Sequence, residues 1–374
     1  MKDFELKKVI CIIEDLEEQI FIYLKYVLEE ALSLQSLFFY ETIERGINYI
    51  DTSESYMNGN SERIIGRVLK KFGRDKIHVC TKFHLRGKNW NTESIIKSVE
   101  ASLKRLDTDY VDVLSTHGAS EKEQLTDERV LNAFEKLKKQ GKFRFQGLSC
   151  HKSHYEVIKR AVECGYYDMV QIAYNVFDIK DYEKEIEKYD DYLGASGLGK
   201  LIKLAKSKDV GVIAMKTLKV GGKRQNLERY KIGNFSIYQA MLKRVLENRD
   251  ISSVVTEMLN FKQLKENLSI LDRDLTYEER KALYAYVFKN SKGYCHMCGL
   301  CERKCPSGIK TTEILRYLAY YESYLKEDYA KNEYAKLKKN EKTFCTDCGE
   351  CERVCPYNVP IREKLKLADR ILTI

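Results

Sequence analysis

The sequence predicts an α/β protein: a (β/α)8 TIM barrel followed by a small, mainly helical domain. Before residue 290, short runs of β-branched residues alternate with amphipathic helical segments, and their number favours a closed barrel over an open sheet. All three prolines, in contrast, lie after residue 305. This shift in composition predicts a boundary near residue 290, between a barrel domain at 1–289 and a second domain at 290–374.

The first expected strand is residues 9–13, with the sequence VICII. Residues 1–40 are atypical for a barrel, because no glycine turn follows this strand and residues 14–44 read as one or two helices. The later strands are expected at 47–51, 77–82, 111–117, 143–149, 168–174, 211–216 and 251–256. Amphipathic helices are expected between them, for example at 92–105 and 126–140, and a connecting helix at 276–289.

Eight of the twelve cysteines form two copies of one pattern in the second domain. The copies are Cys295, Cys298, Cys301 and Cys305 followed by Pro306, and Cys345, Cys348, Cys351 and Cys355 followed by Pro356. This spacing binds cubane iron–sulfur clusters in bacterial-type ferredoxins. Gly299 and Gly349 fall where the backbone must turn tightly. The pattern therefore predicts a ferredoxin-like domain with two [4Fe–4S] clusters.

In two-cluster ferredoxins the fourth cysteine of each run ligates the other cluster. The expected ligand sets are Cys295, Cys298, Cys301 and Cys355 for one cluster, and Cys345, Cys348, Cys351 and Cys305 for the other. Structural zinc and disulfides are the alternatives. Zinc usually takes paired Cys-x2-Cys units and has no use for a third and fourth thiol in each run. Disulfides require an oxidising compartment, to which nothing in the sequence points.

A tyrosine-rich segment at 311–338 separates the two cysteine runs and is expected to be a helical insert. Its tyrosines recur at helical spacing, so we interpret them as core or docking residues rather than as redox groups. The cysteines outside the runs are expected to be ordinary buried residues.

Composition and charge exclude several classes of function. With 44% hydrophobic and 32% charged residues, the chain is expected to be a soluble globular protein. Its net charge of +9 is not gathered into a basic block, which argues against a nucleic-acid partner. No stretch of 18 apolar residues and no signal peptide are found, so no membrane association is expected. Together with the reduced thiols, this predicts a cytoplasmic protein.

Catalytic groups of barrel enzymes lie at the C-terminal ends of the strands. In this chain the ends of the second, third and fourth strands carry Asp51, Lys82 and His117, and the loop after the second strand carries Tyr56. With the motifs around them, these residues resemble the aldo-keto reductases. The motifs are GINYIDTSESYMNGNSE (46–62), TK (81–82), SLKRLDTDYVDVLSTH (102–117), GKFRFQGLS (141–149), VQIAYN (170–175), GVIAMK (211–216) and QLKENL (263–268). The cysteine runs make the resemblance one to the iron–sulfur type, with a C-terminal dicluster domain.

The resemblance implies a catalytic tetrad in which Tyr56 is the general acid. A tyrosine with a pKa of about 10 is a poor proton donor at neutral pH, and a neighbouring ammonium such as Lys82 lowers that pKa. Asp51 would hold the lysine charged and oriented. A neutral His117 would donate a hydrogen bond to the substrate carbonyl oxygen as charge develops on it.

The resemblance also implies a nicotinamide cofactor. Ser149 and Gln171 match positions that hold the carboxamide, and Asn267 matches an adenine contact. Glu257 lies near the position of the adenosine phosphate, where a carboxylate would repel a 2′-phosphate and favour NADH over NADPH. Met215 stands where many members stack an aromatic ring, and Gly221 and Gly222 would let the backbone approach the pyrophosphate.

The leading hypothesis is an oxidoreductase that reduces a small aldehyde or ketone with NAD(P)H, coupled to iron–sulfur electron transfer. Hydride transfer moves two electrons and a cluster moves one, so a ferredoxin or flavoprotein partner is expected to connect them. The alternative is an electron-transfer or redox-sensing subunit whose barrel no longer binds nicotinamide. A third possibility is an incomplete barrel that lacks its first strand.

Overall fold

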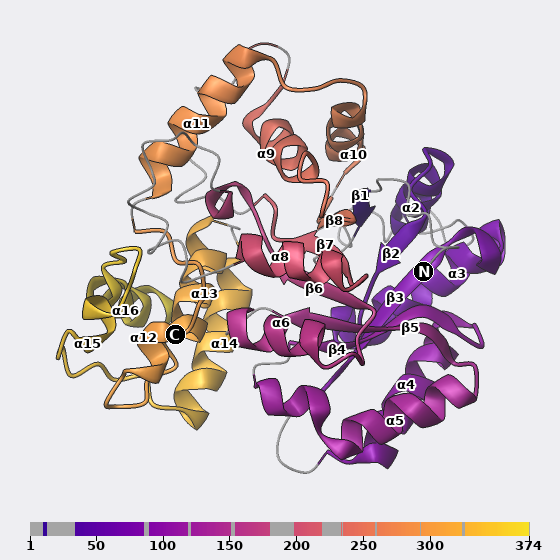
Figure 1. Cartoon of the computed structure of the whole chain (residues 1–374), viewed down its shortest axis with the longest axis horizontal. Coiled ribbons are helices and arrows are strands. Elements are labelled where there is room, and N and C mark those ends of the chain that lie inside the picture. The colour runs from indigo at the N-terminus through magenta and orange to yellow at the C-terminus, as the bar shows by residue number, and fades with distance from the viewer. Residues whose placement is uncertain are drawn as a thin grey trace, which may run out of the picture.

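The computed structural model describes residues 10–12, 34–85, 90–118, 121–150, 154–179, 198–218, 233, 235–258, 260–291, 293–323 and 326–373. Eight parallel strands close into a barrel in the order of the sequence (Figure 1). They are β1 (Ile10–Ile12), β2 (Tyr49–Asp51), β3 (His78–His84), β4 (Val111–His117), β5 (Phe143–Cys150), β6 (Met169–Ala173), β7 (Gly211–Met215) and β8 (Ser253–Thr256). The predicted (β/α)8 TIM barrel is confirmed.

The short first strand closes the barrel. Ile10 pairs with Val254 of β8, and Ile12 pairs with both Thr256 of β8 and Ile50 of β2. The prediction of a strand at 9–13 is therefore confirmed, and the possibility of an incomplete barrel is wrong, because β2 and β8 are not left as open edges. Of the helices expected over 14–44, α2 (Leu34–Glu44) is present, and residues 13–33 lie outside the described part of the chain.

Helices surround the strands of the barrel. They are α3 (Asn60–Phe72), α4 (Thr92–Leu106), α5 (Glu128–Lys139), α6 (His154–Glu163), α8 (Leu198–Ser207), α9 (Ile237–Leu246) and α10 (Phe261–Leu268). Short 3-10 turns lie at η2 (Tyr56–Gly59), η3 (Arg74–Lys76), η4 (Lys122–Thr126), η5 (Val176–Asp178) and η8 (Ser269–Leu271). The start of α4 is fixed by a capping box, in which the Asn91 side chain accepts a hydrogen bond from the Ser94 backbone N–H.

The barrel interior is filled by its own layer of side chains, separate from the core between strands and helices. This inner cluster comprises Tyr49, Cys80, Val113, Met169, Ile213, Met215 and Val255. Gly147 of β5 borders the same layer, because a Cβ added there would lie 2.9 Å from the Val113 Cγ1 and 3.1 Å from the Met169 Cε. Of the cysteines outside the runs, Cys80 and Cys150 are fully buried, as expected, whereas Cys164 is only half-buried.

Residues after the barrel form a second group of helices, gathered on one side of it (Figure 1). The connecting helix α11 (Tyr277–Ser291) leads to α12 (Leu300–Arg303), α13 (Thr311–Ser323), α14 (Glu327–Asn340), α15 (Glu350–Arg353) and α16 (Ile361–Leu372). The insert expected at 311–338 is thus two helices, α13 and α14, which pack against each other. Tyr317 and Tyr334 are buried in the core that these helices share with α16.

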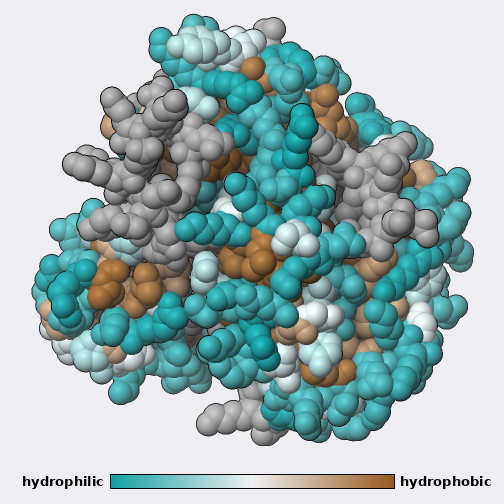
Figure 2. Space-filling view, viewed as in Figure 1, coloured by the Kyte–Doolittle hydropathy of each residue, from teal (hydrophilic) through white to brown (hydrophobic). Residues whose placement is uncertain are grey.

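Hydrophilic residues cover most of the face seen in Figure 2, and the hydrophobic residues visible there form small, separate patches. Among the described helices, none is long and apolar enough to cross a membrane.

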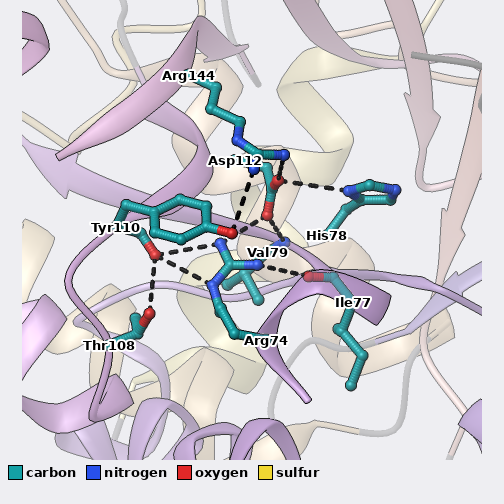
Figure 3. A network of polar contacts seen from close by, with 8 residues as sticks. All are labelled: Arg74, Ile77, His78, Val79, Thr108, Tyr110, Asp112 and Arg144. Carbon is teal, nitrogen blue, oxygen red and sulfur yellow. Dashed lines mark hydrogen bonds and ion pairs between the residues drawn. The ribbon is translucent and has the colours of Figure 1, made fainter. Parts of the chain in front are cut away.

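A buried carboxylate organises the bottom of the barrel, at the N-terminal ends of β3 and β4 (Figure 3). Asp112 accepts hydrogen bonds from the Arg74 guanidinium at 2.7 Å, from the Arg144 guanidinium at 3.1 Å and from the Val79 backbone N–H at 2.9 Å. Burial raises the pKa of Asp112, but the hydrogen bond with His78 and the charge of Arg74 outweigh it and hold the pKa below its usual range. Residues at this end of a barrel serve stability rather than chemistry.

Replacing Asp112 by asparagine should destabilise the fold without changing the active site. Removing one partner from a buried ion pair costs about 3 kcal/mol. Because the pKa of Asp112 is lowered in the folded state, its contribution is complete above the unfolded pKa of about 4 and is lost as the pH falls through the folded pKa. Urea unfolding of wild type and Asp112→Asn should therefore differ most at pH 7 and least near pH 3. A difference that does not change with pH would contradict the charge-based explanation.

Candidate active site and cluster sites

A fully buried ion pair lies at the C-terminal ends of β2 and β3. The Lys82 ammonium is 2.6 Å from Asp51 Oδ1, and neither side chain is exposed. The ammonium also donates a hydrogen bond to the Thr52 carbonyl oxygen at 2.8 Å. Adjacent strands in register bring the two together, since Asp51 pairs with Cys80 two residues before Lys82. The ion pair holds Lys82 in one position, with its charge directed to the top of the barrel.

Tyr56 lies beside this ion pair on the short turn η2. The Lys82 ammonium is 5.0 Å from the centre of the Tyr56 ring, which is 7% exposed. Met57 and Asn58 of the same turn have φ angles of 50° and 52°, which turns the backbone sharply between Tyr56 and the start of α3. This turn keeps Tyr56 at the mouth of the barrel.

His117, at the end of β4, faces Tyr56. The two ring centres are 5.6 Å apart and the rings are nearly perpendicular. The Nδ1 atom of His117 lies 2.9 Å from the Ser53 Oγ. His84, at the end of β3, stacks on the His117 ring at 4.2 Å, and its Nε2 lies 3.1 Å from the Ser55 Oγ. The structure thus brings all four predicted catalytic residues together.

Ser149 and Gln171 lie next to each other on β5 and β6, where they are paired in register. The Gln171 Nε2 donates a hydrogen bond to Asp51 Oδ2 at 3.2 Å, which connects this pair to the tetrad. The Ser149 Oγ and the Gln171 Oε1 are buried and have no hydrogen-bond partner among the described residues. Buried polar atoms are rarely left unsatisfied, so a bound group is expected to complete them.

Among the other residues expected at the cofactor, Met215 lies next to Gln171, whereas Asn267 and Glu257 follow β8. Asn267 is buried near the end of α10, which follows β8. Met215 is buried at the end of β7, with its sulfur 3.8 Å from the Gln171 Nε2. Glu257 follows β8 and forms an ion pair with Lys326 of the C-terminal region. Gly221 and Gly222 lie outside the described residues.

A groove beside the tetrad opens between the loop after β2 and the helix α4. It is lined by both polar and apolar groups, from Glu54, Ser55, His84, Trp90, Ser94, Ile95, Ser98 and Arg105. Ser55 and His84 link the groove to His117. A substrate that reaches the tetrad from this side would meet hydroxyl, carboxylate and indole groups.

The eight cysteines of the two runs surround two small cavities. Cys295, Cys298, Cys301 and Cys355 line one, a space of about 320 Å³, and Cys305, Cys345, Cys348 and Cys351 line the other, of about 300 Å³. Each cavity therefore takes three cysteines from one run and the fourth from the other. Gly299 and Gly349 precede α12 and α15 with φ angles of 77° and 80°, so the expected tight turns are present.

The thiols within each cavity raise one another's pKa. Burial raises the pKa of Cys298 to about 11, and the neighbouring Cys295 and Cys355 add to the increase. Burial, Glu352 and Cys345 raise the pKa of Cys351 to about 11. Such thiols become thiolates only when a cation compensates the charge. Among the described residues, no group of three or more His, Cys, Asp or Glu side chains is placed to hold a single metal ion.

The first cysteine run is attached to the loop after β6. The Nδ1 atom of His296 lies 2.7 Å from Asp178 Oδ1, and both side chains are at most 5% exposed. His296 also stacks on Tyr357 at 3.8 Å, and Tyr294 stacks on Phe177 at 4.4 Å. These contacts join residues on both sides of the expected boundary at 290.

Comparison with known proteins identifies both parts of the chain. Residues 38–234, more than half of the sequence, match the aldo/keto reductase family. The chain belongs to the aldo/keto reductase family. Residues 294–360 of this aldo/keto reductase match a 4Fe-4S dicluster domain. The family and the added iron–sulfur domain predicted from the sequence are thus confirmed.

Three curated relatives match between 36% and 66% of this chain. The uncharacterized oxidoreductase YqkF of Bacillus subtilis (strain 168) is 29% identical over 270 residues, 66% of this chain and 85% of that protein. The L-galactose dehydrogenase of Arabidopsis thaliana is 28% identical, over 61% of this chain and 75% of its own. The NADH-specific methylglyoxal reductase of Escherichia coli (strain K12) is 35% identical, over 36% of this chain and 45% of its own.

A solved aldo-keto reductase from Klebsiella pneumoniae in complex with NADPH has the same fold. Its TM-score is 0.53 at 20% identity, and the match covers 68% of this chain and 84% of that one.

The sequence did not reveal several residues that support the tetrad. Ser53 and His84 contact His117, and neither lies in a recognisable catalytic pattern. The position of Ser53 two residues after a strand end that carries Asp51 is the one signal that could have indicated it. His296, between two cysteines of the first run, is buried against Asp178, a contact that its sequence position does not indicate.

Proposed function

We propose that this aldo/keto reductase reduces a small aldehyde or ketone with NAD(P)H and is coupled to electron transfer through two [4Fe–4S] clusters. One observation carries the proposal: Asp51, Lys82, Tyr56 and His117 converge at the C-terminal ends of β2, β3 and β4. We further propose a domain boundary near residue 290, a cytoplasmic location, and a ferredoxin or flavoprotein as redox partner.

Tyr56 would donate the proton in this reaction. When bound, NAD(P)H would supply the hydride for the carbonyl carbon, and the Tyr56 hydroxyl would supply the proton for the carbonyl oxygen. The Lys82 ammonium, held by Asp51 at 2.6 Å, stabilises the negative charge left on the Tyr56 oxygen. Because the ion pair is fully buried, this charge acts with little screening by water.

His117 would bind the carbonyl oxygen through Nε2. Its Nδ1 is 2.9 Å from the Ser53 hydroxyl, and if that hydroxyl donates, the imidazole carries its proton on Nε2. An Nε2–H group aimed at the substrate donates a hydrogen bond that strengthens as charge develops on the oxygen. The stack with His84 keeps the ring in this orientation.

The barrel residues fit a nicotinamide carboxamide. A primary amide has one carbonyl acceptor and two N–H donors. The Ser149 Oγ can donate and the Gln171 Oε1 can accept, and both are buried without a partner among the described residues. A barrel that no longer bound nicotinamide, as in a pure electron-transfer subunit, would leave these two atoms unsatisfied at a cost of stability.

The cysteines support two [4Fe–4S] clusters. Four thiols line each cavity, and the spacing of the cysteines within each run is the one that binds cubane clusters in ferredoxins. Since a hydride carries two electrons and each cluster carries one, exchange between them needs a two-electron to one-electron converter such as the flavin of a partner protein.

Titration of the anaerobically purified holoprotein with NADH and NADPH tests the proposal. We expect binding of at least one dinucleotide, measured by calorimetry, together with aldehyde-dependent oxidation of it. Ser149→Ala should weaken that binding on the order of tenfold, because one carboxamide hydrogen bond is lost. Ser207→Ala, on the exposed end of α8, is the control and should bind as the wild type does. Failure of both dinucleotides to bind would instead support the electron-transfer subunit.

A further inference from the structure

The two cysteine-lined cavities differ in their surroundings. The inner site is the cavity lined by Cys295, Cys298, Cys301 and Cys355, and the outer site is the cavity lined by Cys305, Cys345, Cys348 and Cys351. The rings of His296 and Tyr357 also line the inner site, whereas no aromatic ring of a described residue lines the outer one. Cys348 of the outer site is exposed, and Phe344, directly before the second cysteine run, is 83% exposed. The outer site therefore lies at the surface.

A turn of the barrel holds the wall of the inner site in place. This turn is η5, which follows β6 and ends at Asp178. The His296 Nδ1 lies 2.7 Å from Asp178 Oδ1, and the two side chains are 4% and 5% exposed. The His296 ring stacks in turn on Tyr357, with 3.8 Å between the ring centres. A carboxylate of the barrel thus lies directly behind the two rings that line the inner site.

Asp178 is fixed by hydrogen bonds within η5. Its Oδ2 accepts a hydrogen bond from the Asn175 backbone N–H at 3.0 Å, and the Asn175 side chain accepts one from the Phe177 N–H at 3.0 Å. Asn175 and Phe177 also contact Tyr294 of the C-terminal region, through a hydrogen bond of 3.0 Å and a ring stack at 4.4 Å. The position of the Asp178 carboxylate relative to the inner site is therefore determined by the fold.

A buried carboxylate close to an iron–sulfur cluster lowers the reduction potential of that cluster. Reduction adds one negative charge to the cluster, and a nearby carboxylate repels this charge. The repulsion is strongest where water does not screen it, as at Asp178. The carboxylate of Asp347, in the second cysteine run, is 49% exposed and pairs with Lys366 at 3.0 Å. Solvent and this cation offset its charge, so Asp347 opposes reduction at the outer site less than Asp178 does at the inner site.

We propose that Asp178 is a positioning residue for the inner site, which holds His296 in the wall of the cavity and lowers the reduction potential of the inner cluster alone. This inference rests on the proposed pair of [4Fe–4S] clusters. The barrel thereby sets the difference in potential between the two clusters, and hence which of them holds a single electron. Asp178 lies on the segment that begins with β6, the strand that carries Gln171. This segment thus connects the proposed carboxamide contact with the inner cluster.

The test is a redox titration of the anaerobic holoproteins with dithionite, which supplies one electron to each cluster, followed by electron paramagnetic resonance. Asp178→Asn should favour reduction of one cluster on the order of tenfold, which raises its midpoint potential by about 59 mV, and should leave the other cluster unchanged. Asp178→Glu keeps the charge and should return the potential toward the wild-type value. The affected cluster should be the one that Cys348→Ala retains, because Cys348 lines only the outer site.

Phe177→Leu is the matched control, because it loosens the same contact between the turn and Tyr294 without removing a charge. It should change the reduction equilibrium of the inner cluster less than twofold. Asp347→Asn removes a carboxylate near the outer site and should leave the inner cluster unchanged. An equal shift in Phe177→Leu and Asp178→Asn, a shift of both clusters in Asp178→Asn, or no shift would overturn the role of Asp178 while the clusters stand. A wild-type protein without two reducible clusters would overturn the proposed clusters and this inference together.

Discussion

Replacing Tyr56 by phenylalanine should abolish carbonyl reduction while leaving the barrel and the clusters intact. The change removes one oxygen atom and keeps the ring, so the contacts with His117 and with the Lys82 ammonium remain. General acid catalysis by a positioned side chain contributes about 10²- to 10⁴-fold to the rate. We therefore expect turnover to fall by about this factor, with the dinucleotide affinity unchanged.

Substitution of Tyr56 tests the mechanism more cleanly than substitution of Lys82 or Asp51. Removing Lys82 or Asp51 would leave a fully buried charge without its partner, which costs about 3–5 kcal/mol and could unfold the barrel. Tyr56→Phe avoids this cost, so lost activity can be assigned to the missing proton donor. Tyr166→Phe, at an exposed position before β6, is the control for loss of a hydroxyl. Aldehyde-dependent NAD(P)H oxidation at the wild-type rate in Tyr56→Phe would remove it as the acid.

The sequence predicted much of the fold because barrel strands carry local signals. Each strand is a short β-branched run, and the end of each run indicates which residues face the mouth, which is how Asp51, Lys82 and His117 were found. Even the three-residue first strand could be located, although the helices expected after it could be followed only from Leu34.

Contacts between residues that are far apart in the sequence could not be predicted in this way, because no local sequence pattern indicates them. Glu257 and Lys326 are 69 positions apart, and a single charge in a loop is ordinarily solvated, so nothing in the sequence pairs them. The helical insert expected at 311–338 is divided into α13 and α14, and no glycine or proline in the sequence between these helices indicates the division. His296 has a local environment, between two cysteines, that gives no indication of its distant partner Asp178.

Replacing Cys355 by alanine should remove the cluster of the first cysteine run, although Cys355 belongs to the second run. The cavity that Cys355 lines is otherwise formed by Cys295, Cys298 and Cys301. Each thiolate of a cubane site binds one iron atom, so loss of Cys355 leaves this cluster without one of its four ligands. We therefore expect the cluster to be lost and the iron content to fall from about eight to about four atoms per chain. The tetrad should be unaffected, because none of its residues lines either cavity.

Double variants separate crossed from uncrossed ligation more sharply than either single change. If ligation is crossed, Cys298→Ala with Cys355→Ala damages one cluster twice, and about four iron atoms remain. Cys348→Ala with Cys355→Ala then damages both clusters, and almost no iron remains. Uncrossed ligation predicts the reverse, since Cys348 and Cys355 would then share a cluster. Iron analysis with electron paramagnetic resonance of the reduced proteins counts the clusters in each variant. The pair that retains iron therefore identifies which cysteines act together, whatever the stability of each single variant.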